Sequence, residues 1–442
     1  MNESLITSLN RIREVSSNIY HQYIPELTSD SDIGKLAQPV LSVPEVYNEF
    51  CSALVNRIVY TQFIAKSFRN PFVVLEGDAL PLGYSGQEIY TNPQKGRVYN
   101  PDDFAGLLIK YEAQVKVQYT HINVDVQYPV TFSRQALKKA FTSWGDLESF
   151  IENLSNSLYN GMYIDEYNAT RQLMAGAFKD NIAQYVVVDA VDSETDAKTF
   201  VAKARELFLN FQIPSSEYNS WAKVGGDGDP VVTWTNPEDI VFIVRNDIRS
   251  YLDVNVMAAA FNISATTLLG NILPIKDFDI YAEDGTTKIF DGSGILGLIA
   301  DKAWFRIRRQ DSWMDEFYNP NNRSIQYYLN NVKMYNASLF ANHMFICTSA
   351  PIVPATALKF NETAPTVAEG GKIRLTLTAT PFQATDTITF SSGTVAKATV
   401  EKIDNRTVEV TGVDAGTSVI TASNGASTPV TATVTVTVTA SA

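Results

Sequence analysis

The 442-residue sequence has few of the residues that build metal or disulfide sites. It has two cysteines, Cys51 and Cys347, and three histidines, His21, His121 and His343. The cysteines have no Cys-x-x-Cys or Cys/His ligand spacing, which argues against a disulfide framework and a zinc site. The histidines are isolated, and no HxxxH, HExxH or G-x-S-x-G motif occurs. We therefore expect two buried reduced thiols, ordinary structural or surface histidines, no metal, no cofactor and no catalytic residues.

Positive charge and long apolar runs are also scarce. The 35 Lys and Arg residues against 48 Asp and Glu residues give a net charge of -13, whereas gripping nucleic acid needs clustered Lys and Arg. No apolar run of about 18 residues and no apolar core of signal-peptide length is present, so we expect neither a membrane span nor secretion by that route. The composition is typical of a globular protein, and the length predicts two or three domains.

The clearest boundary lies near Pro351, because the residues beyond it contain no Tyr, Trp, His or Cys. There, Val and Thr alternate along 430–438, which predicts a strand with one buried face. Shorter strands separated by Gly, Asp and Asn turns are expected at 373–380, 386–390, 407–410 and 418–422. This spacing predicts a β-sandwich of about 90 residues.

A second β-rich segment, 75–129, combines many Gly and Pro turns with a long alternating run. Over 112–120 the odd positions are Ala113, Val115, Val117 and Tyr119, and the even positions are polar. We expect an antiparallel strand whose polar face is exposed to solvent. So long a stretch of turns and strand is typical of a loop that projects from its domain.

The remaining segments predict a mixed α+β fold. The N-terminal residues predict a helical arm that extends along the chain before it packs against anything. Ser133 is suited to cap a helix. Apolar residues at helical spacing predict one long helix over 146–178. Further helices are expected at 45–59, 197–211 and 254–261, and strands at 185–188, 240–244 and 298–307.

Three polar groups could carry chemistry, and each has a plainer interpretation. The segment 225–229 suggests a calcium loop but lacks the required carboxylate spacing, so it is expected to be a solvated loop. Asp165-Glu166 and Asp315-Glu316 are adjacent pairs that point apart on a helix, so we expect solvated faces or partners in ion pairs between subunits. The basic run 306–309, beside Trp304 and Phe305, is expected to be a subunit contact rather than a nucleic-acid site.

Several ordered motifs resemble the major capsid protein of small podophages of the phi-twenty-nine type. They are Leu80-Pro81-Leu82-Gly83, Glu88-Ile89-Tyr90-Thr91, the run 137–150, Tyr159-Asn160, Asp165-Glu166-Tyr167, the runs 252–256, 260–262 and 269–271, and Asp301-Lys302-Ala303-Trp304-Phe305. The C-terminal segments 367–371, 377–381, 388–392 and 410–417 look like a bacterial immunoglobulin-like domain of the second group, with Phe390 where that family usually has Trp.

The resemblance implies a Hong Kong ninety-seven type capsid fold in residues 1–350, followed by an all-β immunoglobulin-like sandwich in 351–442. Within the first part it implies an N-terminal arm and helix (1–74), an E-loop (75–130), a P-domain (131–238 and 298–350, with spine helix 146–178) and an A-domain (239–297). We expect subunit-interface residues in the loop and the basic run: Leu80, Pro81, Leu82, Tyr90, Val115, Val117, Tyr119, Arg306, Arg308 and Arg309.

The function implied is a shell subunit, not an enzyme, that forms hexamers and pentamers of an icosahedral or prolate phage head around the genome. Implied partners are a scaffolding protein, a portal protein at one vertex, head decoration or fibre proteins, and packaged double-stranded DNA nearby. The location implied is the virion, after assembly in the bacterial cytoplasm. Two alternatives stay open: a tail or surface adhesin that displays the sandwich, and a hydrolase with an accessory immunoglobulin-like domain.

Overall fold

A computed structural model describes residues 5–29, 32–53, 68–81, 86–99, 109–224, 229–250, 272–282 and 285–440. The chain divides by its contacts into two units. Unit 1 comprises 1–88, 119–171 and 305–336, and unit 2 comprises 89–118, 172–304 and 337–442. The expected helix at 254–261 and most of the glycine-rich loop at 225–229 lie outside the described residues.

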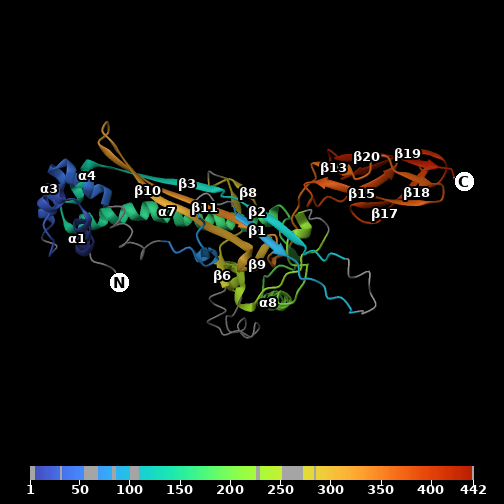
Figure 1. The fold of residues 1–442 in the computed structure, drawn as a ribbon, viewed down its shortest axis with the longest axis horizontal. Helices are drawn as coiled ribbons and strands as arrows, with labels where there is room; N and C mark the ends of the chain where they lie inside the picture. The colour runs from blue at the N-terminus through green and yellow to red at the C-terminus, as the bar shows by residue number, and fades with distance from the viewer. Residues whose placement is uncertain are drawn as a thin grey trace. The chain divides into compact units, whose positions relative to one another are not determined.

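Unit 1 is built on a long helix and a three-stranded sheet (Figure 1). The sheet has the order β10 (Phe305–Asn319), β11 (Ser324–Ala337), β3 (Val124–Ser133), and β11 and β3 are antiparallel from Ser324↔Ser133 to Lys333↔Val124. The helix is α7 (Trp144–Lys179), so the predicted long helix is confirmed. Leu154, Leu158 and Met162 of this helix share one core with Tyr327 and Leu329 of the sheet.

Hydroxyl side chains begin the two helices that follow β3. The Ser133 hydroxyl accepts a hydrogen bond from the Ala136 N–H at the start of α6 (Arg134–Ala140), as expected of an N-cap. Ser143 caps the long helix, because its hydroxyl accepts from the Asp146 N–H at 3.2 Å. The Asp146 carboxylate in turn accepts from the Ser143 hydroxyl.

The N-terminal segment is helical but does not form an extended arm in its described residues. It folds as α1 (Leu5–Val15), α2 (Asn18–Tyr23), α3 (Ile33–Ser42) and α4 (Pro44–Ala53). Ile12, Tyr20 and Phe50 are each at most 1% exposed and belong to the same core as the sheet and α7. Their burial accounts for the packing, because fully burying one large apolar side chain contributes about 1.5–3 kcal/mol.

Unit 2 contains a five-stranded mixed sheet of order β4-β12-β9-β5-β6. Its strands are β4 (Tyr185–Val187), β12 (His343–Cys347), β9 (Ile295–Asp301), β5 (Ile240–Arg245) and β6 (Ile272–Ile275). Helix α8 (Glu194–Asn210) covers the sheet through Phe200, Leu207 and Phe208. The strand expected at 298–307 is two strands, since a turn at Lys302–Trp304 separates β9 from β10.

The strand pairing within unit 2 does not follow the domain limits that the resemblance implies. Strands β4 and β12 and most of β9, which the resemblance assigns to the P-domain, lie in one sheet with β5 and β6 of the expected A-domain region. The division of units also falls within α7, after Arg171. The domain limits taken from the resemblance therefore stay a prediction.

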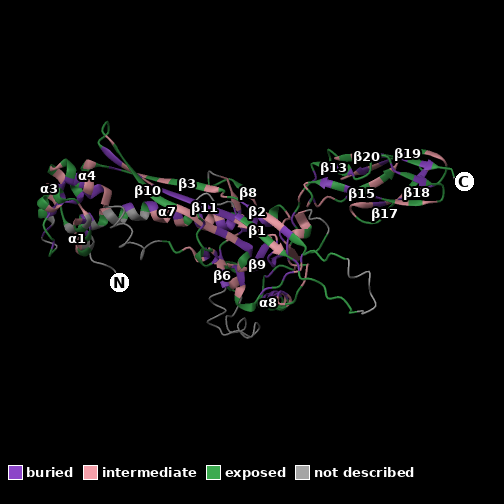
Figure 2. Cartoon of the chain, viewed as in Figure 1, coloured by how far each residue is buried: buried purple, intermediate pink, exposed green. Residues whose placement is uncertain are grey.

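The predicted C-terminal sandwich is confirmed as two four-stranded sheets, β13-β15-β18-β17 and β14-β20-β19-β16. The strands are β13 (Ala357–Phe360), β14 (Thr366–Ala368), β15 (Lys372–Thr380), β16 (Thr389–Ser392), β17 (Ala398–Lys402), β18 (Thr407–Gly412), β19 (Gly416–Ser423) and β20 (Thr431–Thr439). In β20, Val434, Val436 and Val438 are buried and the Thr residues are exposed, as their alternation predicted (Figure 2). The assignment to the second immunoglobulin-like group stays a prediction.

Candidate assembly surface and its supporting polar clusters

The segment expected to project is a two-stranded ladder, β1 (Gly86–Thr91) with β2 (Val115–Thr120). Beyond the two strands the pairing continues, because the Asn92 N–H donates to the Gln114 carbonyl at 3.0 Å and the Gln94 side chain donates to the Glu112 carbonyl at 3.2 Å. The two segments of the loop thus stay paired beyond the ends of the strands.

The buried face of β2 is the reverse of the prediction. Lys116 and Thr120 are 5% and 6% exposed, whereas Val115 and Tyr119 are 50% and 77% exposed. The Lys116 ammonium lies 3.5 Å from the Asp229 carboxylate and 5.8 Å from the centre of the Trp221 ring. A lysine can be buried this way because its stem is apolar and its charge finds a partner. The polar face of β2 therefore packs within the chain, and the apolar face is left outside.

Exposed large apolar side chains continue along the rest of the loop. Val98 and Tyr99 are 88% and 87% exposed, and Ile89, Ile109 and Tyr111 are 61%, 54% and 60% exposed. Together with Val115 and Tyr119 they form a set that we call the loop apolar surface. Exposed apolar side chains gathered in one segment make it a candidate interaction surface.

The side-chain amide of Asn92 fixes the base of the loop, because it hydrogen-bonds to a neighbouring segment as a backbone amide does in a sheet. The Asn92 amide nitrogen donates to the Pro230 carbonyl at 2.8 Å, and its oxygen accepts from the Val232 N–H at 3.1 Å. The Tyr90 hydroxyl donates to the Val232 carbonyl, and its ring stacks on Phe340 with centroids 5.6 Å apart. Burial raises the pKa of Tyr90. Tyr90 is therefore held within its own chain.

The other expected loop contacts have mixed positions. Leu80 is buried, and its N–H donates to the Arg309 carbonyl at 2.8 Å. Pro81 is exposed and Val117 is half-buried, while Leu82 lies outside the described residues. The structure thus leaves Pro81, Val115 and Tyr119 as the more open of these candidates, and their role in subunit contact stays a prediction.

The basic run 306–309 is largely engaged within unit 1. The Arg306 guanidinium forms an ion pair with Glu88, and its Nε donates to that carboxylate at 3.2 Å. Arg308 packs beside Gly77, where a Cβ would lie 3.6 Å from its Nε. Arg309 pairs with Glu166 at 3.0 Å. These intrachain pairs give Arg306 and Arg309 a role other than the expected subunit contact, which stays untested.

Arg309 belongs to a buried charge cluster that joins four segments of unit 1. The Lys333 ammonium lies 2.8 Å from both the Glu76 and the Glu166 carboxylates, and Arg309 lies 3.6 Å from Glu76. The Asn331 amide donates to Glu166 at 3.1 Å. Lys333 and Glu166 are 1% and 4% exposed, so both charges are taken out of water. The cluster connects α7, β10, β11 and the residue after the 3-10 turn Pro71–Leu75.

The expectation of a solvated or intersubunit Glu166 is therefore wrong, although Asp165 beside it is exposed. Burying an ion is costly unless partners satisfy it, and removing one partner of a buried pair is strongly destabilising. Two cations and two carboxylates meet here, so the cluster is neutral as a whole. The second expected pair also bonds within the chain, since Asp315 accepts from the Asn330 amide at 2.9 Å. No spacing in the sequence indicated these partners.

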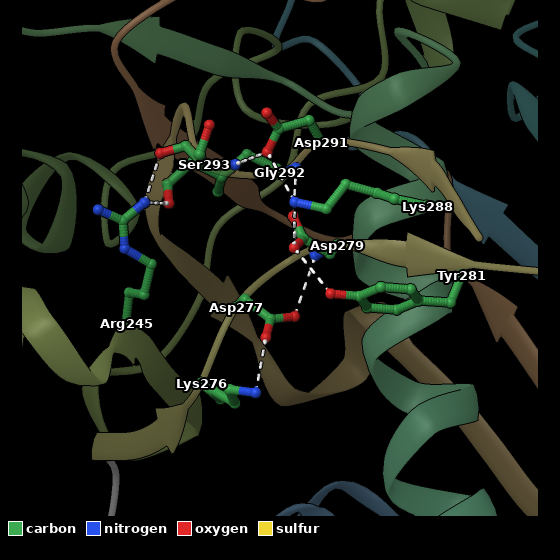
Figure 3. Close-up of polar contacts among 10 residues, drawn as sticks. Arg245, Lys276, Asp277, Asp279, Tyr281, Lys288, Asp291, Gly292 and Ser293 are labelled. Carbon is green, nitrogen blue, oxygen red and sulfur yellow. Dashed lines mark hydrogen bonds and ion pairs between the residues drawn. The ribbon is translucent and has the colours of Figure 1, made fainter. Parts of the chain in front are cut away.

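A second polar cluster fixes the hairpin β7–β8 (Ile280–Tyr281 and Lys288–Phe290) in unit 2 (Figure 3). The Asp279 carboxylate accepts from the Gly292 N–H at 2.8 Å and from the Tyr281 hydroxyl at 3.2 Å, and it pairs with Lys288 at 2.7 Å. Burial acts to raise the pKa of Asp279, but Lys288 and the Gly292 N–H hold it below its usual value. A Cβ at position 292 would lie 2.4 Å from the backbone of Phe278, so glycine is required there.

His343 and both cysteines are buried within the chain. His343 is fully buried, its Nδ1 donates to the Ala341 carbonyl at 3.0 Å, and its Nε2 accepts from the Gln184 N–H at 3.1 Å. Burial lowers the pKa of His343 to about 4. Cys51 and Cys347 are buried free thiols. Within the described ranges, no group of three or more His, Cys, Asp or Glu residues could hold a metal ion. No helix among these residues is long and apolar enough to cross a membrane.

Comparisons with known proteins agree with the resemblance in the sequence. The family model described as Phi29-like phage major capsid protein matches residues 9–347. The major capsid protein of Bacillus phage PZA is 30% identical over 373 residues, which cover 83% of this chain and 78% of the relative. That of Bacillus phage B103 is 29% identical over 366 residues, covering 82% of this chain and 77% of the relative.

The fold is also that of known capsids. A chain from the capsid structure of Staphylococcus phage Andhra superposes with a TM-score of 0.53 at 17% identity, covering 65% of this chain and 87% of the other. At that identity the likeness concerns the fold, and it supports the expected Hong Kong ninety-seven type architecture. The chain therefore belongs to the Phi29-like phage major capsid protein family.

Proposed function

We propose that copies of this chain assemble into hexamers and pentamers of a closed phage head, icosahedral or prolate, that encloses the genome. The observation that carries this proposal is the loop apolar surface, whose side chains are 50% to 88% exposed in a chain that has ample core elsewhere. In the assembled head these side chains lie against a neighbouring copy. The comparisons do not favour a tail or adhesin protein, and the family is structural.

The loop is suited to such a contact because its backbone is paired and its base is fixed. The two segments of the loop pair with each other, and Asn92 bonds to Pro230 and Val232. The loop therefore loses little conformational freedom when it binds a neighbour. Each large apolar side chain that a neighbour fully covers contributes about 1.5–3 kcal/mol. Because the ladder is only two strands wide, it can bend and keep its contact with a neighbouring subunit. The same contact can then form in pentamers and in hexamers, where the angle between subunits differs.

Symmetry supplies the remaining stability. A closed shell repeats one modest contact many times, so each subunit is held by several neighbours at once. The net charge of -13 suits a container from which DNA must be released, because a strongly basic inner wall would retain it. We further propose that the subunit assembles in the bacterial cytoplasm with a scaffolding protein, meets a portal protein at one vertex, and accepts head decoration or fibre proteins.

The C-terminal sandwich is proposed to lie on the outer surface of the head. There it bridges neighbouring capsomers or binds cell-surface material weakly. Its own apolar core, made entirely of residues 355–438, supports separate folding. Deleting the residues after Pro351 should therefore leave a folded subunit, and aggregation of every such truncation would contradict this boundary.

Electron microscopy of the purified protein tests the proposal. The full chain is expressed alone and together with a scaffolding protein, and the products are separated by sedimentation and imaged in negative stain. Closed shells, tubes or hexamer sheets are expected. Rods with three-fold symmetry would favour a tail protein, and persistent monomers under both conditions would contradict a capsid function.

A further inference from the structure

Strand β3 of unit 1 has an outer edge with which no described strand pairs. In the order β10-β11-β3 it hydrogen-bonds to β11 alone, and it is 10 residues long. The opposite edge of the sheet is partly covered by the chain itself, since the Gly77 N–H donates to the Ile307 carbonyl of β10 at 2.9 Å. An open edge of this length presents unpaired N–H and C=O groups that can bind a strand of another molecule. Four alternate residues along β3 are exposed, namely Asp125, Gln127, Pro129 and Thr131.

The pairing with β11 shows which backbone groups of β3 point to this edge. The Arg134 N–H donates to the Arg323 carbonyl at 3.1 Å, which continues the register Ser324↔Ser133. In an antiparallel pair, residues alternate between those that bond to the partner strand and those whose backbone groups face away from it. The even-numbered residues of β3 therefore bond to β11, and the backbone groups of the odd-numbered residues in 125–131 face the open edge.

Pro129 lies in the middle of this edge and removes one of its donors. Proline has no N–H, and its ring occupies the position from which an N–H would reach an incoming strand. A strand that paired here would leave a carbonyl without a donor opposite Pro129 and would meet the ring. The fold itself needs no donor at this position, because the backbone of residue 129 faces away from β11, and Tyr128 and Val130 beside it pack on the core.

We propose that Pro129 prevents β3 from pairing edge to edge with a strand of a second copy of this chain, and so limits which contacts between copies can form. Copies that gather at high concentration with an open strand edge form irregular aggregates by such pairing. Blocking this edge leaves association to side-chain contacts such as those of the loop apolar surface. The inference goes beyond the proposed shell function, because it concerns irregular association whether or not shells form.

The first test compares Pro129→Val with a matched control, Thr131→Val, in the full chain. Both changes place a Val at an exposed position on the same edge of β3, but only Pro129→Val adds an N–H there. Each variant is checked for folding by its melting curve, and gradient sedimentation separates free subunits, shells and irregular aggregates that bind thioflavin T. Pro129→Val should raise the fraction in irregular aggregates at least fivefold, and Thr131→Val should leave it within twofold of the wild type. Equal fractions in the two variants would overturn the inference.

The second test moves the proline along the same edge. In the double variant Pro129→Val/Thr131→Pro the edge again lacks one outward N–H, so the fraction in irregular aggregates should return to within twofold of the wild type. Persistent aggregation of a double variant that melts like the wild type would show that the missing donor does not protect the edge. Because irregular aggregates are counted apart from shells, failure of the wild type to form shells would count against the proposed function and not against this inference.

Hydrogen exchange in the unaltered chain tests the geometry without any substitution. In free subunits the protection factors of the Gln127 and Thr131 amides, which face the open edge, should be at least tenfold lower than those of Tyr128 and Val130, which bond to β11. Equal protection of the two sets would show that the edge is covered within the subunit, and Pro129 would then have no open edge to protect.

Discussion

The C-terminal sandwich and the larger preceding part treat polarity in opposite ways. Among the described residues, the sandwich buries one polar side chain, Ser418, and otherwise fills its interior with apolar groups. The larger part buries charged and polar side chains such as Glu166, Asp279, Lys333 and His343. It also exposes apolar ones along the 86–119 loop and near α8.

The difference shows what each part requires for its stability. The sandwich has an apolar core of its own, and along β20 it buries the Val residues and exposes the Thr residues. The larger part uses buried ion pairs to fix its elements and leaves apolar surface uncovered, as expected of a piece that neighbours complete. All five Trp residues precede Pro351, so tryptophan fluorescence follows the unfolding of the larger part alone.

The largest expected effect comes from breaking the buried charge cluster with Lys333→Met. The change leaves Glu76 and Glu166 with one cation between them, and losing a partner of a buried pair costs about 3–5 kcal/mol of unfolding free energy. Urea unfolding followed by tryptophan fluorescence measures it. The control in the sandwich is Lys372→Met, because Lys372 pairs with Glu409 at the surface and is 57% exposed. Because the sandwich has no Trp, this control is followed by hydrogen exchange of β15 and β18. Its loss of stability should be small, and equal losses in the two variants would contradict the contrast.

The next effect is a loss of stability in acid caused by His343. Its pKa is about 4 in the folded chain, against an ordinary value of about 6.5. The unfolded chain therefore binds a proton first as the pH falls, and stability that is complete above pH 6.5 is lost progressively down to pH 4. The full loss is about 3 kcal/mol. Urea unfolding followed by tryptophan fluorescence between pH 7 and 4.5 measures it.

His343→Gln is the control for this prediction, and it should flatten the dependence on pH between 6.5 and 4.5. The sandwich has no histidine, so the protection factors of its strands in hydrogen exchange, which correct for the intrinsic effect of pH, should change little over the same range. An unchanged slope in His343→Gln would assign the acid sensitivity to another group.

A smaller effect is expected within the sandwich from Val436→Ala. Val436 is fully buried in β20, and losing its two methyl groups should lower the stability of the sandwich by about 2 kcal/mol. Hydrogen exchange of β19 and β20 measures it, since the sandwich has no Trp. Thr435→Ala, on the exposed face of the same strand, is the matched control and should change the exchange little. The prediction fails if the two variants behave alike.

The smallest effect on subunit stability is expected from Tyr119→Ser, which removes an apolar side chain that is 77% exposed. Its free energy of unfolding should stay within about 0.5 kcal/mol of the wild type, as is usual for surface changes. Its assembly into shells should nevertheless be impaired. A marked loss of subunit stability would mean that this face is covered within the chain after all.

Much of the fold could be predicted from the sequence, because period and capping are local properties. The long helix, the strand at 240–244 and the Val/Thr alternation of β20 all predicted their elements. The same alternation misled at β2, where Lys116 is inside and Val115 is outside. Alternation shows that a strand has two different faces, but which one is covered depends on Trp221 and Asp229, about a hundred residues away. The pairing of Lys333 with Glu76 and Glu166 likewise joins distant segments that no local pattern relates.

Whether the loop apolar surface joins neighbouring copies is tested by its accessibility before and after assembly. Hydroxyl-radical footprinting with mass spectrometry reports the oxidation of Tyr99 and Tyr119, which are 87% and 77% exposed in the subunit. If these residues lie against a neighbouring copy, their oxidation should fall at least fivefold in purified shells relative to free subunits. Equal oxidation in the two states would show that this surface does not join subunits, and the account given for the exposed apolar residues would be wrong.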